Sequence, residues 1–428
     1  MNLDIFEIPI IDTHEHLVDE SYRAHVEKDV LSLFLRHYLP TDLMNAGLTE
    51  KKIQEMRDPS VKIEKRWKDL EPFWLQVNNT AYAQALKIAV RDLYKIEQIN
   101  QNTIAEIANR VEEASKPGLY SHVFQKAGIK WAMVHDLDDI YNPNALYDTP
   151  IPRPSDPPEL FRKVLNGSAL IYIRNKTQIM YLQDLLQEGP IHTLLDWIGV
   201  IENVVAQNAG IVAVKLYHAY FLSLAEKRPT YSEAENVFNQ LIAANYPEES
   251  LSHAVCQPLV DYLTHVLIQE AVKHNIPIQI HTGLLNGSFN NLQNANPMHL
   301  IPLLMEYREA RFVLFHGSYP WIREYIALGK MYPNVWLDLC WIWVISPQAG
   351  RLLLNEIIET IPRNKATAFG GDYIFVEGSY GHSVMARQNI ERVLKDKVAE
   401  GWFGVEEARQ YAKAILYDNA LALYGEIR

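Results

Sequence analysis

The sequence predicts an α/β protein, a distorted (β/α)8 barrel of the TIM type with a helical insertion after its first strand. Three observations lead to this prediction. The chain of 428 residues has the length of one large barrel with a sizeable insertion. Short β-rich apolar runs alternate with amphipathic segments of helix length, which is the pattern of βαβ units around a parallel sheet. The sequence contains eight such runs, and this barrel requires eight strands.

The predicted strands cover residues 8–12, 130–135, 169–174, 211–217, 277–282, 311–316, 334–340 and 366–372. Between them, residues 258–274 and 405–422 carry apolar side chains at helical spacing. Thr103 and Glu106 have the spacing of a capping box, which predicts the start of another helix. Residues 150–158 contain five prolines and are expected to form a rigid surface loop.

The first unit is longer than a barrel requires. About a hundred residues separate its strand from the second strand, where a few loop residues and one helix are usual. Two stretches of this segment, residues 29–38 and 82–94, have helical patterns. We therefore expect residues 17–117 to form a helical insertion within a single barrel that spans residues 1–428. The insertion follows a strand, so we expect it at the C-terminal face of the barrel, where active sites form. A lid or specificity wall and a packing or dimer element are both open interpretations.

The composition restricts the class of partner. The net charge is −12, from 40 Lys and Arg against 52 Asp and Glu. Because nucleic-acid binders normally have a basic face, this charge argues against a nucleic-acid partner and against an anionic membrane surface. No apolar stretch reaches the ~18 residues of a membrane helix, and no signal peptide is recognisable. The two cysteines, Cys256 and Cys340, predict reduced thiols. We expect a cytoplasmic protein that acts on a small molecule, with homo-oligomers an open question.

A pair of histidines ends the first predicted strand. His14 and His16 lie two positions apart, so both face the same side of a strand, whose side chains alternate with period two. Two imidazoles in this arrangement can bind one metal ion. In a chain with 15 histidines such a pair alone is weak evidence, and its weight depends on the other strands.

Four further strands end in side chains that bind metal ions or titrate. The fourth strand places a lysine near its end, the fifth and sixth end in histidine, and the eighth ends in aspartate. These residues are Lys215, His281, His316 and Asp372. The carboxyl ends of barrel strands meet at one face, so we expect them all to join His14 and His16 in one site. Imidazole and carboxylate ligands favour Zn²⁺, with Mn²⁺, Fe²⁺ or Co²⁺ as alternatives, over Mg²⁺ or Ca²⁺.

Such a site supports hydrolytic chemistry. A divalent ion with an open coordination position lowers the pKa of a bound water to about 7 and polarises a carbonyl. Asp372 could take the proton from that water and pass it to the leaving group, as a general base and then a general acid. His316 would orient the carbonyl if it is not itself a ligand.

The order HxH, Lys, His, His and Asp on successive strands resembles the amidohydrolase superfamily of metal-dependent barrel hydrolases. The strings IDTHEHL, VAVKLYHAY, IQIHTG, LFHGSYPW and FGGDY are most similar to its amidohydrolase-2 branch. The resemblance covers the whole chain apart from residues 17–117. It implies core metal ligands at four positions, His14, His16, His281 and Asp372. By the same resemblance, His316 is a second-metal ligand in members with two ions and polarises the substrate in members with one.

The resemblance leaves two roles open for Lys215. In members with two ions, the corresponding lysine is carboxylated, bridges the ions and counts as a ligand. In the most similar branch, a lysine in this strand instead pairs with an aspartate or with a substrate carboxylate, and so takes part in catalysis. One or two ions are therefore expected.

These features indicate an enzyme, an amidohydrolase-type hydrolase that cleaves a small amide, lactone or ester. Two alternatives remain. The scaffold also supports non-oxidative decarboxylases and uronate isomerases, and the long insertion is similar to that of uronate isomerases. A catalytically inactive metal-binding relative is the other alternative. Four side chains in the loops after the strands are expected to bind substrate, Tyr217, Trp341, Tyr373 and His382.

Overall fold

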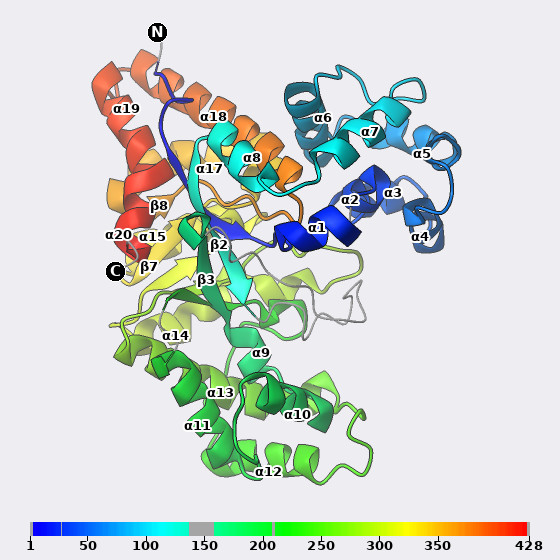
Figure 1. The fold of residues 1–428 in the computed structure, drawn as a ribbon. Coiled ribbons are helices and arrows are strands. Elements are labelled where there is room, and N and C mark those ends of the chain that lie inside the picture. The colour runs from blue at the N-terminus through cyan, green and yellow to red at the C-terminus, as the bar shows by residue number, and fades with distance from the viewer. Residues whose placement is uncertain (1–2, 27, 137–157, 208–209, 426–428) are drawn as a thin grey trace.

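The protein is described here by a computed structural model that covers residues 3–26, 28–136, 158–207 and 210–425. Eight parallel strands follow one another in chain order around a nearly closed barrel, each hydrogen-bonded to the next (Figure 1). The strands are β1 (Ile10–Glu15), β2 (Ile129–Asp136), β3 (Phe161–Asn166), β4 (Ile211–Leu216), β5 (Ile278–Ile280), β6 (Phe312–Leu314), β7 (Val335–Asp338) and β8 (Ala366–Thr367). The predicted TIM-type fold is therefore confirmed.

The segment that follows β8 brings the last strand back to the first. The Thr13 amide donates to the Phe369 carbonyl at 3.1 Å, and the Asp372 amide donates to the His14 carbonyl at 2.7 Å. The His16 amide donates to the Tyr373 carbonyl at 3.0 Å. These bonds place the loop after β8 alongside the HxH sequence of β1. Residues more than 350 positions apart in the chain thus become neighbours.

Helices cover the outside of the barrel. Those between β1 and β2 are α1 (Glu20–Val26), α2 (Val30–Phe34), α3 (Leu39–Asn45), α4 (Glu50–Arg57), α5 (Ile63–Val77), α6 (Ala81–Tyr94), α7 (Ile104–Ala114) and α8 (Leu119–Ala127). Those after β3 and β4 are α9 (Gly167–Ile171), α10 (Lys176–Leu185), α11 (Leu194–Gln207), α12 (Tyr231–Ile242) and α13 (His253–Lys273). The remainder are α14 (Ile301–Glu306), α15 (Ile322–Met331), α16 (Ile342–Ile345), α17 (Pro347–Thr360), α18 (Val376–Ala399), α19 (Val405–Lys413) and α20 (Asn419–Tyr424). None of the described helices is long and apolar enough to cross a membrane.

The segment between β1 and β2 is helical, as the sequence predicts. Helix α6 matches the predicted helix 82–94, whereas α2 ends at Phe34 and covers only part of the predicted stretch 29–38. Thr103 precedes α7 but forms no capping box. Its hydroxyl donates to the Gln98 carbonyl at 2.7 Å and accepts from the Asn100 amide, so it closes a turn before the helix. That the whole chain is one domain stays a prediction.

The predicted third strand, residues 169–174, is wrong. The third strand is instead β3, which lies before the predicted range, and the apolar residues that follow it begin with α9. Asn166 ends the strand because its side-chain oxygen accepts a hydrogen bond from the Ala169 amide at 3.1 Å and caps the helix. Arg162 and Lys163 interrupt the apolar pattern of the true strand, which hides it in the sequence. Most of the proline-rich segment 150–158 lies outside the described residues.

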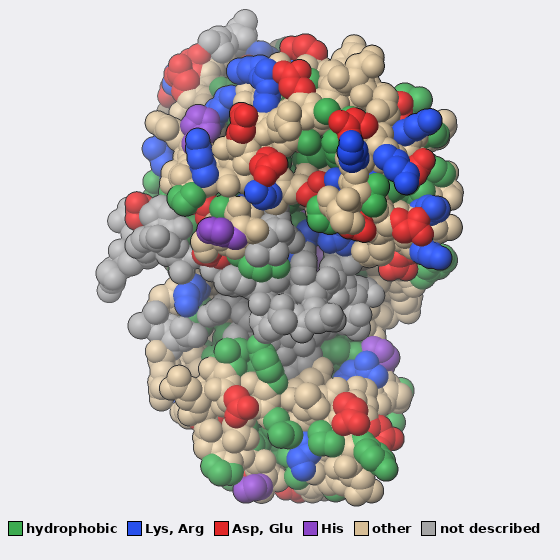
Figure 2. Space-filling view, turned by 45° about the vertical axis from the view of Figure 1, so that its right-hand side comes forward, with side chains coloured by type: hydrophobic (Ala, Val, Ile, Leu, Met, Phe, Trp, Pro, Cys, Tyr) green, Lys and Arg blue, Asp and Glu red, His purple; other side chains and the backbone are tan. Residues whose placement is uncertain are grey.

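The other two predicted helices begin or end differently. Helix α13 starts before the predicted residue 258, because the Ser252 hydroxyl accepts from the Val255 amide and caps it. The predicted helix 405–422 is α19 and α20, joined by one π-helical turn over Ala414–Asp418. On the face drawn in Figure 2, basic side chains are interspersed with acidic ones.

Helices α2 to α7 group on one side of the barrel, next to α18 (Figure 1). One hydrophobic cluster continues from this group into the barrel. It includes Trp67 and Leu86 from the helices, Val313 from β6 and Phe315 just after it. The segment after β1 is thus packed onto the barrel through a shared core.

Gly381 in α18 lies close to the backbone of α6. A Cβ atom at this position would lie 2.0 Å from the Ala85 carbonyl oxygen. The Ala85 carbonyl belongs to the backbone of α6 and cannot rotate away from an added methyl group as a side chain could. We therefore expect Gly381→Ala to lower the free energy of unfolding by about 1–3 kcal/mol. Urea denaturation measures the change. Gly199→Ala in α11, where no atom lies within 4 Å, is the matched control and should be neutral or stabilising. Equal losses in both variants would contradict this account of the contact.

Candidate metal centre

The carboxyl end of β1 brings His14 and His16 to the mouth of the barrel. The register between β1 and β2 shifts by one residue between Asp12 and Glu15, as a β-bulge does. Bulges redirect side chains and are common beside active sites. His14 is buried, and the side chain of His16 is 24% exposed. One imidazole is therefore enclosed, while the other can meet solvent or a substrate.

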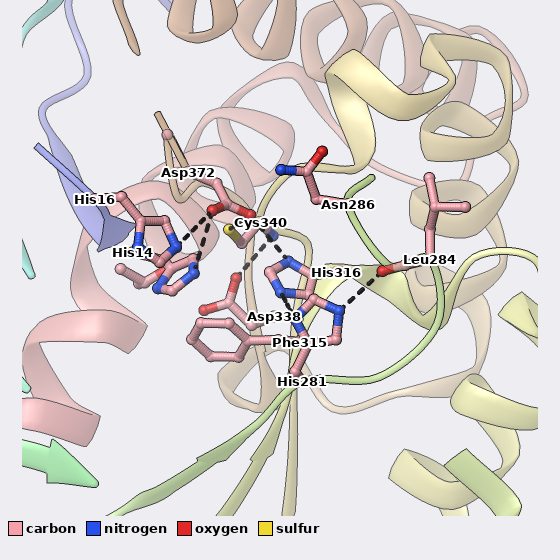
Figure 3. Close-up of polar contacts among 12 residues, drawn as sticks. His14, His16, His281, Leu284, Asn286, Phe315, His316, Asp338, Cys340 and Asp372 are labelled. Atoms are coloured by element: carbon pink, nitrogen blue, oxygen red, sulfur yellow. Dashed lines mark hydrogen bonds and ion pairs between the residues drawn. The ribbon is translucent and has the colours of Figure 1, made fainter. Parts of the chain in front are cut away.

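The Asp372 carboxylate is the centre of the site (Figure 3). Its Oδ1 atom lies 3.3 Å from His14 Nε2 and 3.2 Å from His16 Nε2. Its Oδ2 atom lies 3.6 Å from His316 Nδ1. Histidines from β1 and from the residues just after β6 thus surround a carboxylate from the loop after β8. The predicted strand 366–372 is too long, because β8 ends at Thr367 and Asp372 lies in the loop that follows it.

His281 and His316 form a second contact in the site. His281 Nδ1 lies 2.9 Å from His316 Nε2, and His281 Nε2 lies 2.8 Å from the Leu284 carbonyl oxygen. A carbonyl only accepts hydrogen bonds, so Nε2 of His281 carries the proton and its Nδ1 is an acceptor. His316 Nε2 must then donate. The order of donors fixes the tautomers of both rings.

This order leaves His316 Nδ1 with a lone pair that faces the Asp372 carboxylate. The nitrogen is buried and has no hydrogen-bond partner in the described structure. Two acceptors that face each other at 3.6 Å in a buried place repel each other, and a cation between them would turn both into ligands. His14, His316 and Asp372 each offer one atom within 4.8 Å of the others. The residues present therefore fit a divalent metal ion.

Burial keeps these imidazoles neutral. Loss of hydration and, after it, the nearby Lys215 ammonium together lower the pKa of His281 to about 3. The same two causes hold the pKa of His14 well below the ordinary value for histidine. For His316, burial, the neighbouring His281 ring and Lys215 hold the pKa well below that value. For Asp372, burial opposes ionisation, but the surrounding imidazoles outweigh it and hold the pKa of this carboxyl well below its usual range. The site thus contains neutral nitrogen ligands and an ionised carboxylate.

Lys215 lies inside the barrel beneath the histidines. It is 1% exposed, and its Nζ atom lies 3.6 Å from the centre of the Phe315 ring. A cation over an aromatic face is stabilised by the ring quadrupole. Its position agrees with either role that the sequence leaves open, and its carboxylation stays a prediction.

The four residues predicted to bind substrate differ in their contacts. Trp341 has its ring 5.3 Å from that of His316, and Tyr373 is buried beside Asp372. The Tyr217 hydroxyl accepts a hydrogen bond from Asn166 at 2.9 Å. His382 is fully buried, and its Nδ1 lies 2.9 Å from the Gly371 carbonyl oxygen, so it supports the loop that carries Asp372. Substrate binding by all four residues stays a prediction.

Two carboxylates that the sequence analysis does not single out hold this loop on either side of Asp372. The Gly371 amide donates to Asp12 Oδ1, and the Tyr373 amide donates to Glu15 Oε2, both at 2.9 Å. Asp372 itself has a left-handed backbone with φ of 57°, a conformation that costs free energy for a residue other than glycine. The two bonds stabilise that conformation. The only sequence signal was the proximity of both carboxylates to the HxH pair.

Two further site residues were missed. His135 is the second-to-last residue of β2, and its ring centre lies 4.5 Å from that of His14 and 4.9 Å from that of His16. It ends its predicted strand just as His281 and His316 end theirs, and this was the signal available. Tyr38, between α2 and α3, donates its hydroxyl hydrogen to the Asp372 carbonyl at 2.5 Å. No local pattern marks it, because its contact depends on how the helices after β1 pack.

Comparisons with known proteins agree with the resemblance. Residues 249–425 match the family model described as Amidohydrolase. Over 174 residues the chain is 34% identical to the protein fluG of Emericella nidulans, a match that covers 39% of this chain and 20% of fluG. The aligned part therefore spans about a fifth of that relative's length.

Three solved structures share the fold over nearly the whole chain. The uronate isomerase of Thermotoga maritima has a TM-score of 0.76 at 16% identity, covering 99% of this chain and 96% of its own. The glucuronate isomerase of Caulobacter crescentus has 0.74 at 15% identity, covering 99% and 92%. The "putative metal-dependent hydrolase" of Lactobacillus casei has 0.64 at 15% identity, covering 98% and 96%. At these identities the likeness concerns the fold alone.

Proposed function

We propose that this chain, whose residues 249–425 carry the amidohydrolase family sequence, is a metal-dependent hydrolase that cleaves a small amide, lactone or ester. One observation carries the proposal. A buried lone pair of His316 faces the ionised Asp372 carboxylate, and His14 and His16 contact the same carboxylate. A divalent cation between these groups would turn their mutual repulsion into coordination. We propose one or two divalent ions there, with Zn²⁺ preferred and Mn²⁺, Fe²⁺ or Co²⁺ as alternatives.

The ligands we propose are His14, His16, His281, His316, Asp372 and, if carboxylated, Lys215. A bound divalent ion would lower the pKa of a coordinated water to about 7 and polarise the scissile carbonyl. Asp372, ionised and at the centre of the site, would accept the proton of the attacking water. The same carboxyl would then protonate the leaving nitrogen or oxygen.

The aromatic side chains at the mouth would bind the substrate. Trp341 stacks on Tyr38 with ring centres 4.9 Å apart, and Tyr38 stacks on Tyr82 at 4.7 Å. Tyr38 and Tyr82 come from the segment after β1, so this segment would form one wall of the substrate pocket. This contact favours the specificity-wall interpretation of residues 17–117. We also propose a cytoplasmic location, supported by two buried free thiols, Cys256 and Cys340.

A uronate-isomerase-like reaction is the second candidate. It is favoured by the fold likeness to two such isomerases over 99% of the chain. The experiment is an activity panel with protein purified without chelator and supplied with Zn²⁺ or Mn²⁺. Amides, lactones and esters are tested beside uronates and aromatic carboxylic acids.

We expect turnover in the hydrolytic half of the panel. Conversion of a uronate, or loss of CO₂ from an aromatic acid, without any hydrolysis would replace the hydrolase proposal by the corresponding alternative. A protein that binds metal and converts no compound would favour an inactive metal-binding relative. The variant His122→Gln, at an exposed position of α8, is the control for effects of substitution alone.

A further inference from the structure

We propose that His135, at the end of β2, is a further ligand to the ion held by His14 and His16. The proposal rests on the metal centre of the proposed function and extends its ligands to a strand that the sequence motifs do not include. That ion would then have three imidazole ligands, from β1 and the adjacent β2, with Asp372 beside them.

The geometry of the three rings carries the proposal. His14, His16 and His135 each offer a ring nitrogen within 4.8 Å of the others. Nitrogens bound to one Zn²⁺ at about 2.0–2.1 Å in tetrahedral geometry lie about 3.4 Å apart. Small rotations of the rings would bring their nitrogens from within 4.8 Å to this separation. The three ring centres lie between 4.5 and 4.9 Å apart, so all three rings already surround a common point.

Burial and backbone geometry add to this. His135 is 1% exposed and His14 is 2% exposed, so both imidazoles are held away from water at the same end of the barrel. The bulge in β1 between Asp12 and Glu15 shifts the register against β2, and Glu15 pairs with Val134, the residue before His135. The register thus places the HxH sequence and His135 side by side.

A third imidazole would change the chemistry of the site. Nitrogen-rich ligand sets favour Zn²⁺, Co²⁺ and other first-row transition ions over Mg²⁺ and Ca²⁺, which prefer oxygen. Three imidazole ligands can hold the ion without relying on Asp372. That carboxylate would then be available to accept and donate protons.

The test uses Co²⁺ alone as the probe, with the full-length chain. We compare the parent with His135→Phe, which keeps a planar ring and removes both nitrogens, and with His135→Ala as a second variant should the first fail to fold. The readouts are the dissociation constant of Co²⁺, from competition with a chelating dye, and the visible absorption of the bound ion. His122→Phe, an exposed histidine of α8, is the matched control.

We expect the Co²⁺ dissociation constant to rise at least about tenfold in the His135 variants, with altered absorption bands, and to stay unchanged in His122→Phe. A dissociation constant within about twofold of the parent, with the same spectrum, would overturn the proposal. A parent that binds no Co²⁺ would also overturn it. A parent that binds Co²⁺ but hydrolyses nothing leaves this inference standing while the proposed function fails, so the two failures are distinguishable.

Discussion

Replacing Asp372 with asparagine is expected to reduce kcat/KM by about 10²–10⁴-fold, the usual contribution of a general acid–base group. The amide has nearly the same shape as the carboxylate, so the contacts of the loop after β8 should persist. It cannot take up a proton at neutral pH and carries no charge. The activity is measured on the best substrate of the panel with excess metal ion, so that a lower ion affinity does not limit the rate.

Circular dichroism and bound metal are recorded on the same Asp372→Asn sample. We expect a folded protein that retains metal through its imidazole ligands and has lost turnover. His122→Gln serves again as the control for handling and purification. If Asp372→Asn keeps more than about a tenth of the parental kcat/KM, the general-base role of Asp372 is wrong.

The second large effect, a loss of stability, is expected when the buried ion pair of Arg23 and Glu377 is broken. Both side chains are completely buried, and two bonds of 2.6 and 2.9 Å join the guanidinium to the carboxylate. The Tyr94 hydroxyl donates to the same carboxylate at 2.6 Å. This cluster joins α1 and α6 to the start of α18, which follows the loop that carries Asp372.

Glu377→Gln leaves the Arg23 guanidinium buried without its counter-charge. Removing one partner of a buried pair costs about 3–5 kcal/mol, so we expect a loss of this size in the free energy of unfolding from urea titration. Replacing both partners with apolar residues, Arg23→Met with Glu377→Leu, should cost less than the single change. The matched control is Glu55→Gln, in an exposed pair with Lys52, which should change stability little. Similar losses of unfolding free energy in Glu377→Gln and Glu55→Gln would contradict this account of the buried pair.

The same pair predicts a pH dependence of stability. Burial alone would raise the pKa of Glu377, but Arg23 outweighs it and the net shift is below the ordinary value of 4.5. A carboxyl with a lower pKa in the folded state stabilises the protein fully above the unfolded pKa. That contribution is lost as the pH falls through the folded pKa. Below pH 4.5 the parent should therefore lose stability more steeply than Glu377→Gln, and parallel curves would contradict this assignment.

Strand ends were the part of the site that sequence could predict. A strand has a short, regular repeat, and a barrel brings all carboxyl ends to one face, so the positions of His14, His281 and His316 follow from local patterns. Asp372 lies five residues beyond the end of β8, in the loop at the same face. The wrong third strand has a local cause as well. An apolar helix of five residues, α9, follows β3 directly, and over so short a length its composition resembles that of a strand.

Contacts set by long-range packing could not be predicted. Tyr38 reaches the Asp372 carbonyl across 334 residues of chain, and its position depends on the packing of the helices between β1 and β2, which no motif encodes. The support of the Asp372 loop by Asp12 and Glu15 depends on how the barrel closes between β8 and β1. His135 was accessible in principle, because it ends its strand in the same way as the predicted histidines do.

The most direct test of the metal centre is the metal content per chain by elemental analysis. The parent is purified without chelator, loaded with Zn²⁺ or Mn²⁺ and desalted, beside a His14→Ala/His16→Ala double variant and beside Lys215→Ala. We predict one or two ions per chain in the parent and none in the double variant. Two ions in the parent that fall in Lys215→Ala would assign the bridging role to this lysine, and one ion in both would assign it another role. No ion in the parent, or equal amounts in the parent and the double variant, would contradict the metal centre.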